Sequence, residues 1–121
     1  MTKQKLVITG MGAVTPIGIG VDTYWNNLLA GVKGIAPITR FDTSGLPVHI
    51  AGEVKDFNPA DYLPKKLVRE TDAFMHYALV AANEAIAQSG LPVQEERVGI
   101  VMSSALNGIT TIAETQDECT K

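Results

Sequence analysis

The spacing of apolar and polar residues predicts both strands and helices, and the first third of the chain already contains one of each. The apolar run Leu-Val-Ile at positions 6–8 is too short for a helix, and its β-branched residues favour a buried strand. The Gly-Met-Gly sequence at 10–12 allows the chain to turn abruptly. A helix is predicted over residues 23–30, with Asp22 as its N-cap and Gly31 at its end. This succession of strand, glycine-rich turn and helix predicts an α/β protein.

The clearest helical pattern covers residues 72–89. Small and apolar side chains recur there at three- and four-residue spacing, at Phe74, Ala78, Ala81, Ala82, Ala85 and Ile86. The alanines in this stripe allow a neighbouring element to approach closely. Gly90 is expected to end the helix, and Pro92 prevents it from continuing.

The segment between these two helices is expected to be largely irregular, because Gly, Pro, Thr and Asp are frequent at 31–46. A short strand is predicted at 48–52. Asn58 followed by Pro59 is typical of a helix start, and Pro64 indicates that a second short helix begins there.

The last part of the chain repeats the order of strand, turn and helix. The apolar run at 98–102 predicts a second buried strand, and residues 103–108 predict a turn. A helix is then expected over 109–119.

The glycine-rich turn near the N-terminus permits two interpretations. One is the dinucleotide fingerprint G-x-G-x-x-G, which places a pyrophosphate on a helix N-terminus. Here Thr15 stands at the third glycine position, Pro16 follows it, and the helix starts only near Val21 or Asp22. No acidic residue closes a second strand at the expected distance. A nucleotide site would therefore need an unusual loop.

The other interpretation rests on a resemblance that runs along nearly the whole chain. Val-Ile-Thr-Gly-Met-Gly at 7–12, Thr-Pro-Ile-Gly at 15–18 and a Trp-containing helix ending Leu-Leu-Ala-Gly at 28–31 resemble the opening of the β-ketoacyl-acyl-carrier-protein synthases, the condensing enzymes of fatty-acid synthesis. Further matches follow in the family's order: Gly34-Ile35, Arg40-Phe41-Asp42, Ala51-Gly52, Lys55-Asp56-Phe57, Asp72-Ala73-Phe74, Ser89-Gly90-Leu91 and Val98-Gly99-Ile100-Val101. Each motif is short, but their order along the chain is specific, and it is most similar to the type II synthases.

The resemblance implies a thiolase-like layered α/β fold, and residues 1–121 are expected to form the N-terminal part of a β-ketoacyl synthase domain. The complete enzyme is expected to be a homodimer that elongates fatty acyl chains by decarboxylative Claisen condensation. Its partner would be acyl carrier protein, loaded with acyl or malonyl groups, and it would need no cofactor or metal.

In relatives the nucleophilic Cys of a T-A-C motif, two His and a Lys lie beyond the region matched here. We therefore expect no catalytic residue and no condensation activity in this chain alone. Two alternatives remain open: a non-catalytic module that binds acyl carrier protein, and a nucleotide-binding α/β domain.

Three basic residues, Lys65, Lys66 and Arg69, lie close together in an otherwise acidic chain. On a helix, positions 65 and 69, or 66 and 69, face the same side, and a solvated face is the plain interpretation. In type II synthases, however, this segment carries basic residues that dock the acidic recognition helix of acyl carrier protein. Glu70 stands where a third basic residue is often found, which is expected to weaken that attraction.

The predicted turn at 103–108 departs from the family, whose members usually carry G-S-G-x-G-G there. Ser103, Ala105 and Asn107 replace three of those glycines. If the glycines serve a left-handed backbone, Asn tolerates it best and Ala least. Leu106 falls where the family places an apolar residue that limits the acyl pocket across the dimer interface. Simple packing of Leu106 under a turn is the alternative.

Composition narrows the remaining function classes. A net charge of −3 and a pI near 5.3 argue against nucleic-acid binding. The sequence shows no signal peptide and no long apolar run, and one cysteine cannot form an internal disulfide, so we expect a cytoplasmic protein without membrane association. Cys119 has acidic neighbours, which disfavour a thiolate nucleophile. Neither His49 nor His76 has partners at metal-ligand spacing, and His76 is expected at the surface or its boundary.

Overall fold

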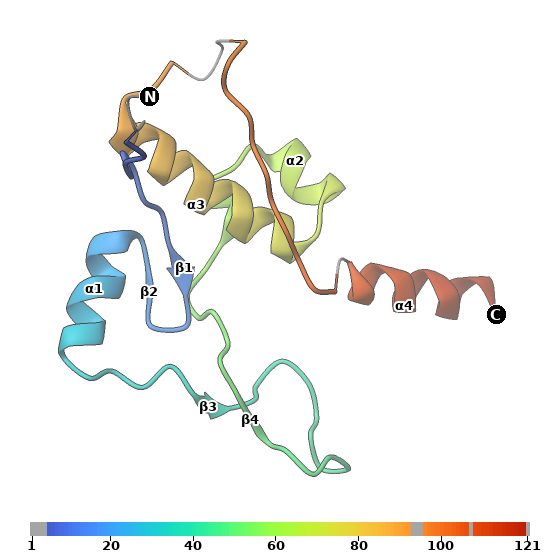
Figure 1. The fold of residues 1–121 in the computed structure, drawn as a ribbon. Coiled ribbons are helices and arrows are strands. Elements are labelled where there is room, and N and C mark those ends of the chain that lie inside the picture. Colours follow the sequence, from blue (N-terminus) through green and yellow to red (C-terminus); the bar gives the residue numbers. More distant parts are fainter. Residues whose placement is uncertain (1–4, 93–95, 107, 121) are drawn as a thin grey trace.

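A computed structural model describes residues 5–92, 96–106 and 108–120 of the chain. Its elements are β1 (Val14–Thr15), β2 (Gly18–Ile19), α1 (Val21–Leu29), β3 (Ala36–Pro37), β4 (Ile50–Ala51), the 3₁₀ turn η1 (Pro59–Asp61), α2 (Lys65–Glu70), α3 (Ala73–Ser89) and α4 (Ile109–Cys119). The long helix α3 lies at the centre, with the β1–β2 hairpin and α1 on one side and α2 on another (Figure 1). β1 pairs antiparallel with β2, and β3 with β4.

Two glycines allow the N-terminal segment to lie directly on the backbone of α3. A Cβ atom at Gly10 would overlap the carbonyl oxygen of Ala85, and one at Gly12 would overlap that of Ala81. Two residues of extended chain advance about 6.6 Å, and four residues of helix advance about 6 Å, so the two spacings match. The predicted close approach to the alanine stripe is confirmed, and the approaching element is this extended segment.

The carboxylate of Glu84 in α3 joins this segment to the start of α1. One oxygen accepts the backbone N–H of Ala13 (3.0 Å) and the other that of Val21 (2.8 Å). One turn further along α3, the amide oxygen of Gln88 accepts the N–H of Met11 (2.6 Å). Glu84 therefore satisfies a free amide of the first turn of α1 and places a negative charge at the positive end of that helix.

The helix α1 confirms the expected span but not its expected N-cap. Gly20, with φ of 86°, occupies the N-cap position, and Asp22 lies one residue inside the helix. The capping role that Asp22 was predicted to play belongs to the distant Glu84. At the other end Gly31 has the expected left-handed φ of 68°.

The short helices before α3 begin where the sequence predicts. The side chain of Asn58 accepts the N–H of Ala60 (3.3 Å), and Pro59 opens η1. Pro64 precedes α2. The helix α3 ends at Gly90, which has a left-handed φ of 64°, as expected.

Aromatic contacts attach the segment 31–57, which contains the β3–β4 pair, to the central helix. Phe57 stacks on Tyr62 with 5.5 Å between ring centroids, and it meets Tyr77 of α3 edge-on at 5.0 Å. The guanidinium of Arg40 donates to the hydroxyl of Tyr77 (2.8 Å), and this hydrogen bond raises the pKa of Arg40. Thr39 donates to Glu53 through its hydroxyl (2.9 Å) and its amide, which lowers the pKa of Glu53.

The core is small, and it contains a histidine. Leu63, His76 and Val80 are the residues buried most deeply in the described part of the chain. His76 is only 7% exposed, so the expectation of a surface or boundary position is wrong. It lies one helical turn from Val80, which places both on the inward face of α3. Within the described residues its Nε2 has no hydrogen-bond partner.

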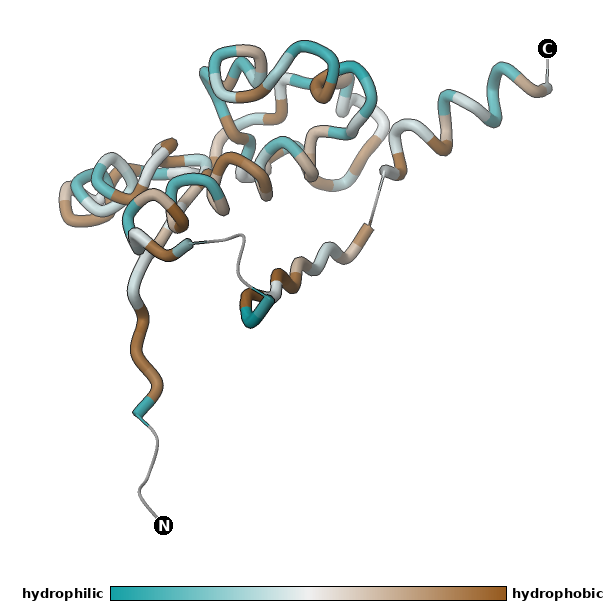
Figure 2. Tube along the Cα trace, turned by 90° about the horizontal axis from the view of Figure 1, so that it is seen from above, coloured by the Kyte–Doolittle hydropathy of each residue, from teal (hydrophilic) through white to brown (hydrophobic). Residues whose placement is uncertain are grey.

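The two apolar runs expected as buried strands are instead exposed and unpaired. At 6–8 the side chains of Leu6, Val7 and Ile8 are 97%, 76% and 84% exposed, and the run extends away from the body of the molecule (Figure 2). Val101 in the run at 98–102 is 94% exposed. A strand needs a neighbour to receive its hydrogen bonds, and no segment of the described chain lies beside these runs to pair with them. Among the described helices, none has the length and apolar character needed to cross a membrane.

We predict that replacing Glu84 destabilises the fold in proportion to the acceptors removed. Glu84→Ala removes both hydrogen bonds to backbone amides and should lower the free energy of unfolding by about 2–4 kcal/mol. Glu84→Gln keeps one acceptor oxygen and should cost about half as much. Urea unfolding followed by the fluorescence of the single tryptophan, Trp25, measures both. Glu114→Gln, on the exposed face of α4, is the matched control, and an equal loss in that variant would contradict the role of Glu84.

A second prediction concerns the glycine contact. Gly12→Ala forces a methyl group into the carbonyl of Ala81 and should cost more than about 2 kcal/mol, because backbone must move on both sides. Gly45→Ala is the control, since a Cβ there meets nothing within 4 Å. That change should be neutral or slightly stabilising. Equal stability of the two variants in the same urea titration would show that the segment does not lie on α3.

Candidate functional site

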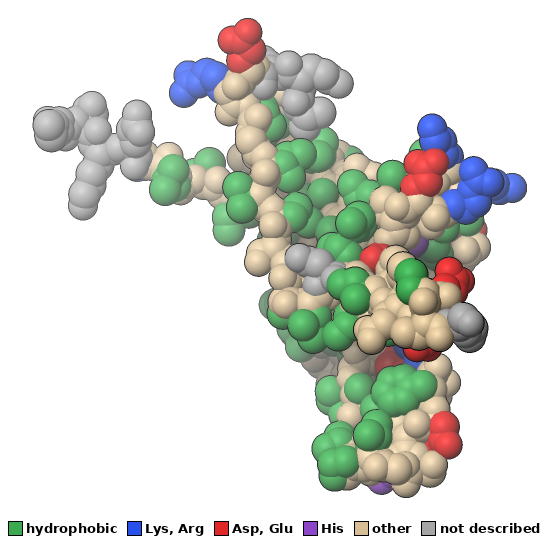
Figure 3. Space-filling model, turned by 90° about the vertical axis from the view of Figure 1, so that its right-hand side faces the viewer, with side chains coloured by type: hydrophobic (Ala, Val, Ile, Leu, Met, Phe, Trp, Pro, Cys, Tyr) green, Lys and Arg blue, Asp and Glu red, His purple; other side chains and the backbone are tan. Residues whose placement is uncertain are grey.

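The three basic residues predicted as a group lie together on α2. Lys65, Lys66 and Arg69 are all exposed within this six-residue helix, and Glu70 follows them. Figure 3 shows lysine and arginine side chains gathered at one edge of the molecule beside a carboxylate. We call Lys65, Lys66 and Arg69 the basic face.

The side of α2 opposite the basic face is apolar and partly buried. Leu67 and Val68 are half-buried, and Leu63, just before the helix, is 6% exposed. The hydroxyl of Thr71 donates to the carbonyl oxygen of Leu67 (2.6 Å) and closes the end of the helix. This amphipathic arrangement fixes the direction in which the three cations point.

Leu106 lies outside the basic face and outside the apolar groove beside α3 that is described below. Its side chain is 69% exposed, and that groove is lined by Ser103 and Ser104 but not by Leu106. Among the described residues only Asp56 combines a side chain with a left-handed φ, so Ser103 and Ala105 occupy ordinary backbone regions. Replacing glycine at these two positions therefore requires no strained backbone, while Asn107 lies outside the described residues.

An apolar groove of about 680 Å³ runs between α3 and the segment 100–104. The side of α3 that faces it carries Phe74, Ala78, Ala82 and Ile86. The single stripe predicted on this helix thus divides into two faces, since Ala81 and Ala85 contact the N-terminal segment instead. The sequence pattern showed the small residues but not that they serve two neighbours.

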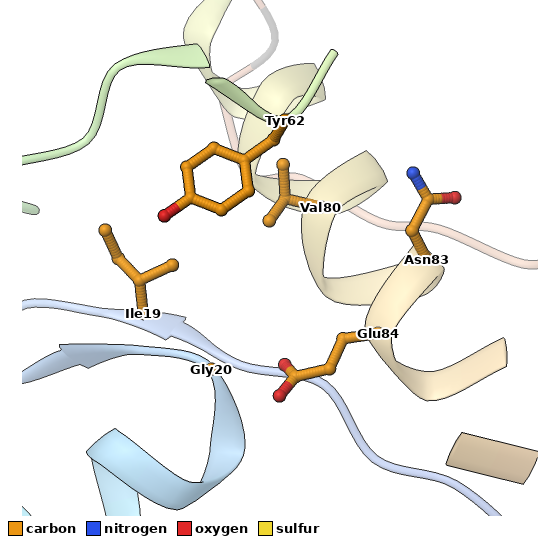
Figure 4. A pocket seen from close by; sticks show the side chains of 6 residues that line it. All are labelled: Ile19, Gly20, Tyr62, Val80, Asn83 and Glu84. Carbon is orange, nitrogen blue, oxygen red and sulfur yellow. The ribbon is translucent and has the colours of Figure 1, made fainter. Parts of the chain in front are cut away.

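A smaller cavity of about 330 Å³ lies between the hairpin and α3, lined by Ile19, Tyr62 and Val80 and by Glu84, whose carboxylate lies beside Gly20 (Figure 4). Both oxygens of that carboxylate already accept backbone amides, one of them at the start of α1. The helix N-terminus on which a nucleotide phosphate would bind is therefore occupied by a negative charge. The structure does not support the dinucleotide interpretation of the glycine-rich turn.

The remaining candidate residues do not assemble into a reactive site. Cys119 is exposed at the end of α4 and lines neither cavity. His49 lies in a loop, where its Nδ1 is 3.0 Å from the hydroxyl of Thr43. Within the described ranges, no cluster of His, Cys, Asp and Glu is arranged to hold a metal ion.

Comparison with known proteins gives the family. Residues 3–120 match the family described as "Beta-ketoacyl synthase, N-terminal domain". The chain is 44% identical over 120 residues to the 3-oxoacyl-[acyl-carrier-protein] synthase 2 of Coxiella burnetii, covering 97% of this chain and 29% of that protein. It is 47% identical over 111 residues to the synthase 2 of Staphylococcus aureus strain COL, covering 89% of this chain and 27% of the relative.

A solved structure agrees with these relatives. The ishigamide ketosynthase/chain length factor superposes with a TM-score of 0.64 at 39% sequence identity, over 72% of this chain and 22% of that one. The chain thus spans less than a third of the length of the relatives it matches. It belongs to the β-ketoacyl synthase family and has the partial, thiolase-like fold of a ketosynthase N-terminal domain.

Proposed function

We propose that this chain is the N-terminal portion of a 3-oxoacyl-[acyl-carrier-protein] synthase, and that the complete enzyme elongates fatty acyl chains. The Coxiella burnetii and Staphylococcus aureus relatives are named 3-oxoacyl-[acyl-carrier-protein] synthase 2, and the family match extends over nearly the whole of this chain. Residues 1–121 would form part of the synthase domain, and the catalytic residues would lie in the remainder. The same proposal places the protein in the cytoplasm.

The reaction we propose for the complete enzyme is a decarboxylative Claisen condensation. A cysteine thiolate takes the acyl group from one carrier protein, forming a thioester and releasing the carrier thiol. Malonyl-carrier protein then loses CO₂, and the resulting carbanion attacks the thioester carbonyl, expelling the cysteine thiolate and giving a β-ketoacyl product. Cys119 lies in Asp-Glu-Cys-Thr-Lys, which is unlike the T-A-C motif of relatives, so this chain alone is not expected to condense.

The part of this function that the chain itself would perform is docking of acyl carrier protein. The observation that supports it is the basic face: three cations point outward from one exposed helix of a chain whose net charge is −3. An acidic recognition helix approaching α2 would meet attractive potential there and repulsion over most of the remaining surface. Glu70 adjoins the basic face and would reduce that attraction.

Leu106 has a second role in the proposal, at the dimer interface. Leu106, Ile109 and Ile112 are 69%, 56% and 63% exposed, so apolar side chains continue from the segment before α4 into its first turn. We propose that a second copy of the complete enzyme covers this surface and that Leu106 there limits the length of the acyl pocket.

A non-catalytic carrier-binding module is the alternative proposal. Both proposals use the basic face to bind acyl carrier protein, and they differ only in whether the polypeptide catalyses condensation. Release of CO₂ from malonyl-carrier protein by a polypeptide that joins this chain to a segment with the T-A-C motif would favour the synthase.

We predict that reversing charge on the basic face weakens binding of acyl carrier protein. Lys66→Glu together with Arg69→Glu should raise the dissociation constant at least tenfold, equivalent to about 1.4 kcal/mol, because two attractive contacts become repulsive. Glu70→Lys should change affinity in the opposite direction. Isothermal titration at low ionic strength measures both, and added salt should reduce the difference.

The control for this test changes the same net charge elsewhere. Lys33→Glu together with Lys55→Glu alters two exposed lysines outside α2. If this control weakens binding as much as the α2 variant, the attraction reflects total charge and the docking proposal fails. Unchanged binding in the α2 variant would reject it directly.

A further inference from the structure

Asp72 stands at the N-cap of α3, but its side chain does not cap that helix. Its backbone carbonyl accepts the N–H groups of Met75 (2.9 Å) and His76 (3.2 Å), while no side-chain capping hydrogen bond forms. The carboxylate turns instead toward α4. One oxygen accepts the hydroxyl of Thr111, and the other lies so close to Gly108 that a Cβ atom there would overlap it.

The helix α4 has few contacts with the rest of the described chain. All of its residues, Ile109–Cys119, are exposed, and the helix projects away from the rest of the molecule (Figure 1). Within the described part of the chain, the hydrogen bond from Thr111 to Asp72 is the one side-chain bond that links α4 to another element.

The chemistry of the contact suits the start of a helix. Gly108 is the N-cap of α4, has a left-handed φ of 59°, and offers no side chain to its free amides. The carboxylate of Asp72 supplies the negative charge that the N-terminus of a helix favours. A side chain on Gly108 would collide with that carboxylate, so the glycine is needed both for its backbone angle and for the contact.

We propose that Asp72 is a positioning residue: its bond to Thr111 fixes the start of α4 against the start of α3 and so sets where the preceding segment 103–106 lies. Because Leu106 belongs to that segment, Asp72 controls the placement of the apolar side chain assigned above to the acyl pocket. The positioning itself follows from the contacts of Asp72, and only its consequence for the pocket rests on the proposed function.

Two native residues provide a direct measurement of this effect. Trp25 in α1 is the single tryptophan, and Cys119 at the end of α4 is the single, exposed cysteine. A fluorescent acceptor attached to Cys119 reports the distribution of its distances from Trp25 through time-resolved energy transfer. Amide hydrogen exchange in α4 gives a second, local readout.

The decisive variants change Thr111. Thr111→Val keeps the shape of the side chain and removes its donor. It should broaden the distance distribution and speed exchange of the hydrogen-bonded amides at the start of α4, from Ile112 on, about tenfold. Thr111→Ser restores the hydroxyl and should restore both values. Thr110→Val makes the same substitution one position earlier, where it should have no such effect, since Val and Thr have similar helix propensities. Asp72→Ala should reproduce Thr111→Val, and combining the two should add little.

The outcomes separate this inference from the proposed function. If Thr111→Val behaves like Thr110→Val, or if Thr111→Ser does not restore order, Asp72 does not position α4. Faster exchange in the C-terminal half of α3 as well would also overturn the inference, because the effect would then be general unfolding. If carrier protein binds equally well after the charge reversal on the basic face, the docking proposal is rejected and these measurements are unaffected.

Discussion

The fold depends on how the N-terminal segment is held against α3. The carboxylate of Glu84 accepts the amides of Ala13 and Val21, which lie on either side of the β1–β2 hairpin. One side chain therefore fixes both ends of the hairpin and the start of α1. This arrangement works only because Gly10 and Gly12 have no side chains, since any Cβ would separate the two backbones and lengthen these hydrogen bonds. The basic face lies apart from this contact, on the short helix α2 that precedes α3.

Much apolar surface remains exposed around this framework. The runs at 6–8 and 98–102 extend without strand partners, and the groove beside α3 is lined by apolar side chains. Only Leu63 and Val80 among the described apolar residues are buried, at 6% and 8% exposure. These features agree with a chain that spans less than a third of the length of its relatives. They also explain why a single hydrogen bond to Asp72 has so large a share in placing α4.

Local rules predicted the helices well, and long-range contacts explain what they missed. The spans of α1, α3 and α4 follow from apolar spacing and from glycines that end or precede each helix, which depend on neighbouring residues alone. The predictions of buried strands at 6–8 and 98–102 were wrong because strand pairing depends on segments far away in the sequence. Asp22 looked like an N-cap by position, but Glu84, 63 residues from the amide of Val21, performs that role. The basic face was predictable because its three cations lie within one helical turn. The contact between Asp72 and Thr111 joins residues 39 positions apart, so no pattern among neighbouring residues could predict it.

The most direct test of this account is an NMR titration of the isotope-labelled chain with acyl carrier protein. It follows each backbone amide and so locates binding without altering the protein. We predict that the largest shift changes occur at α2, around Lys65, Lys66 and Arg69, and that α1 and the far end of α4 change little. Shift changes confined to the apolar groove beside α3, or no change with carrier protein in excess, would contradict the claim that the basic face docks the carrier.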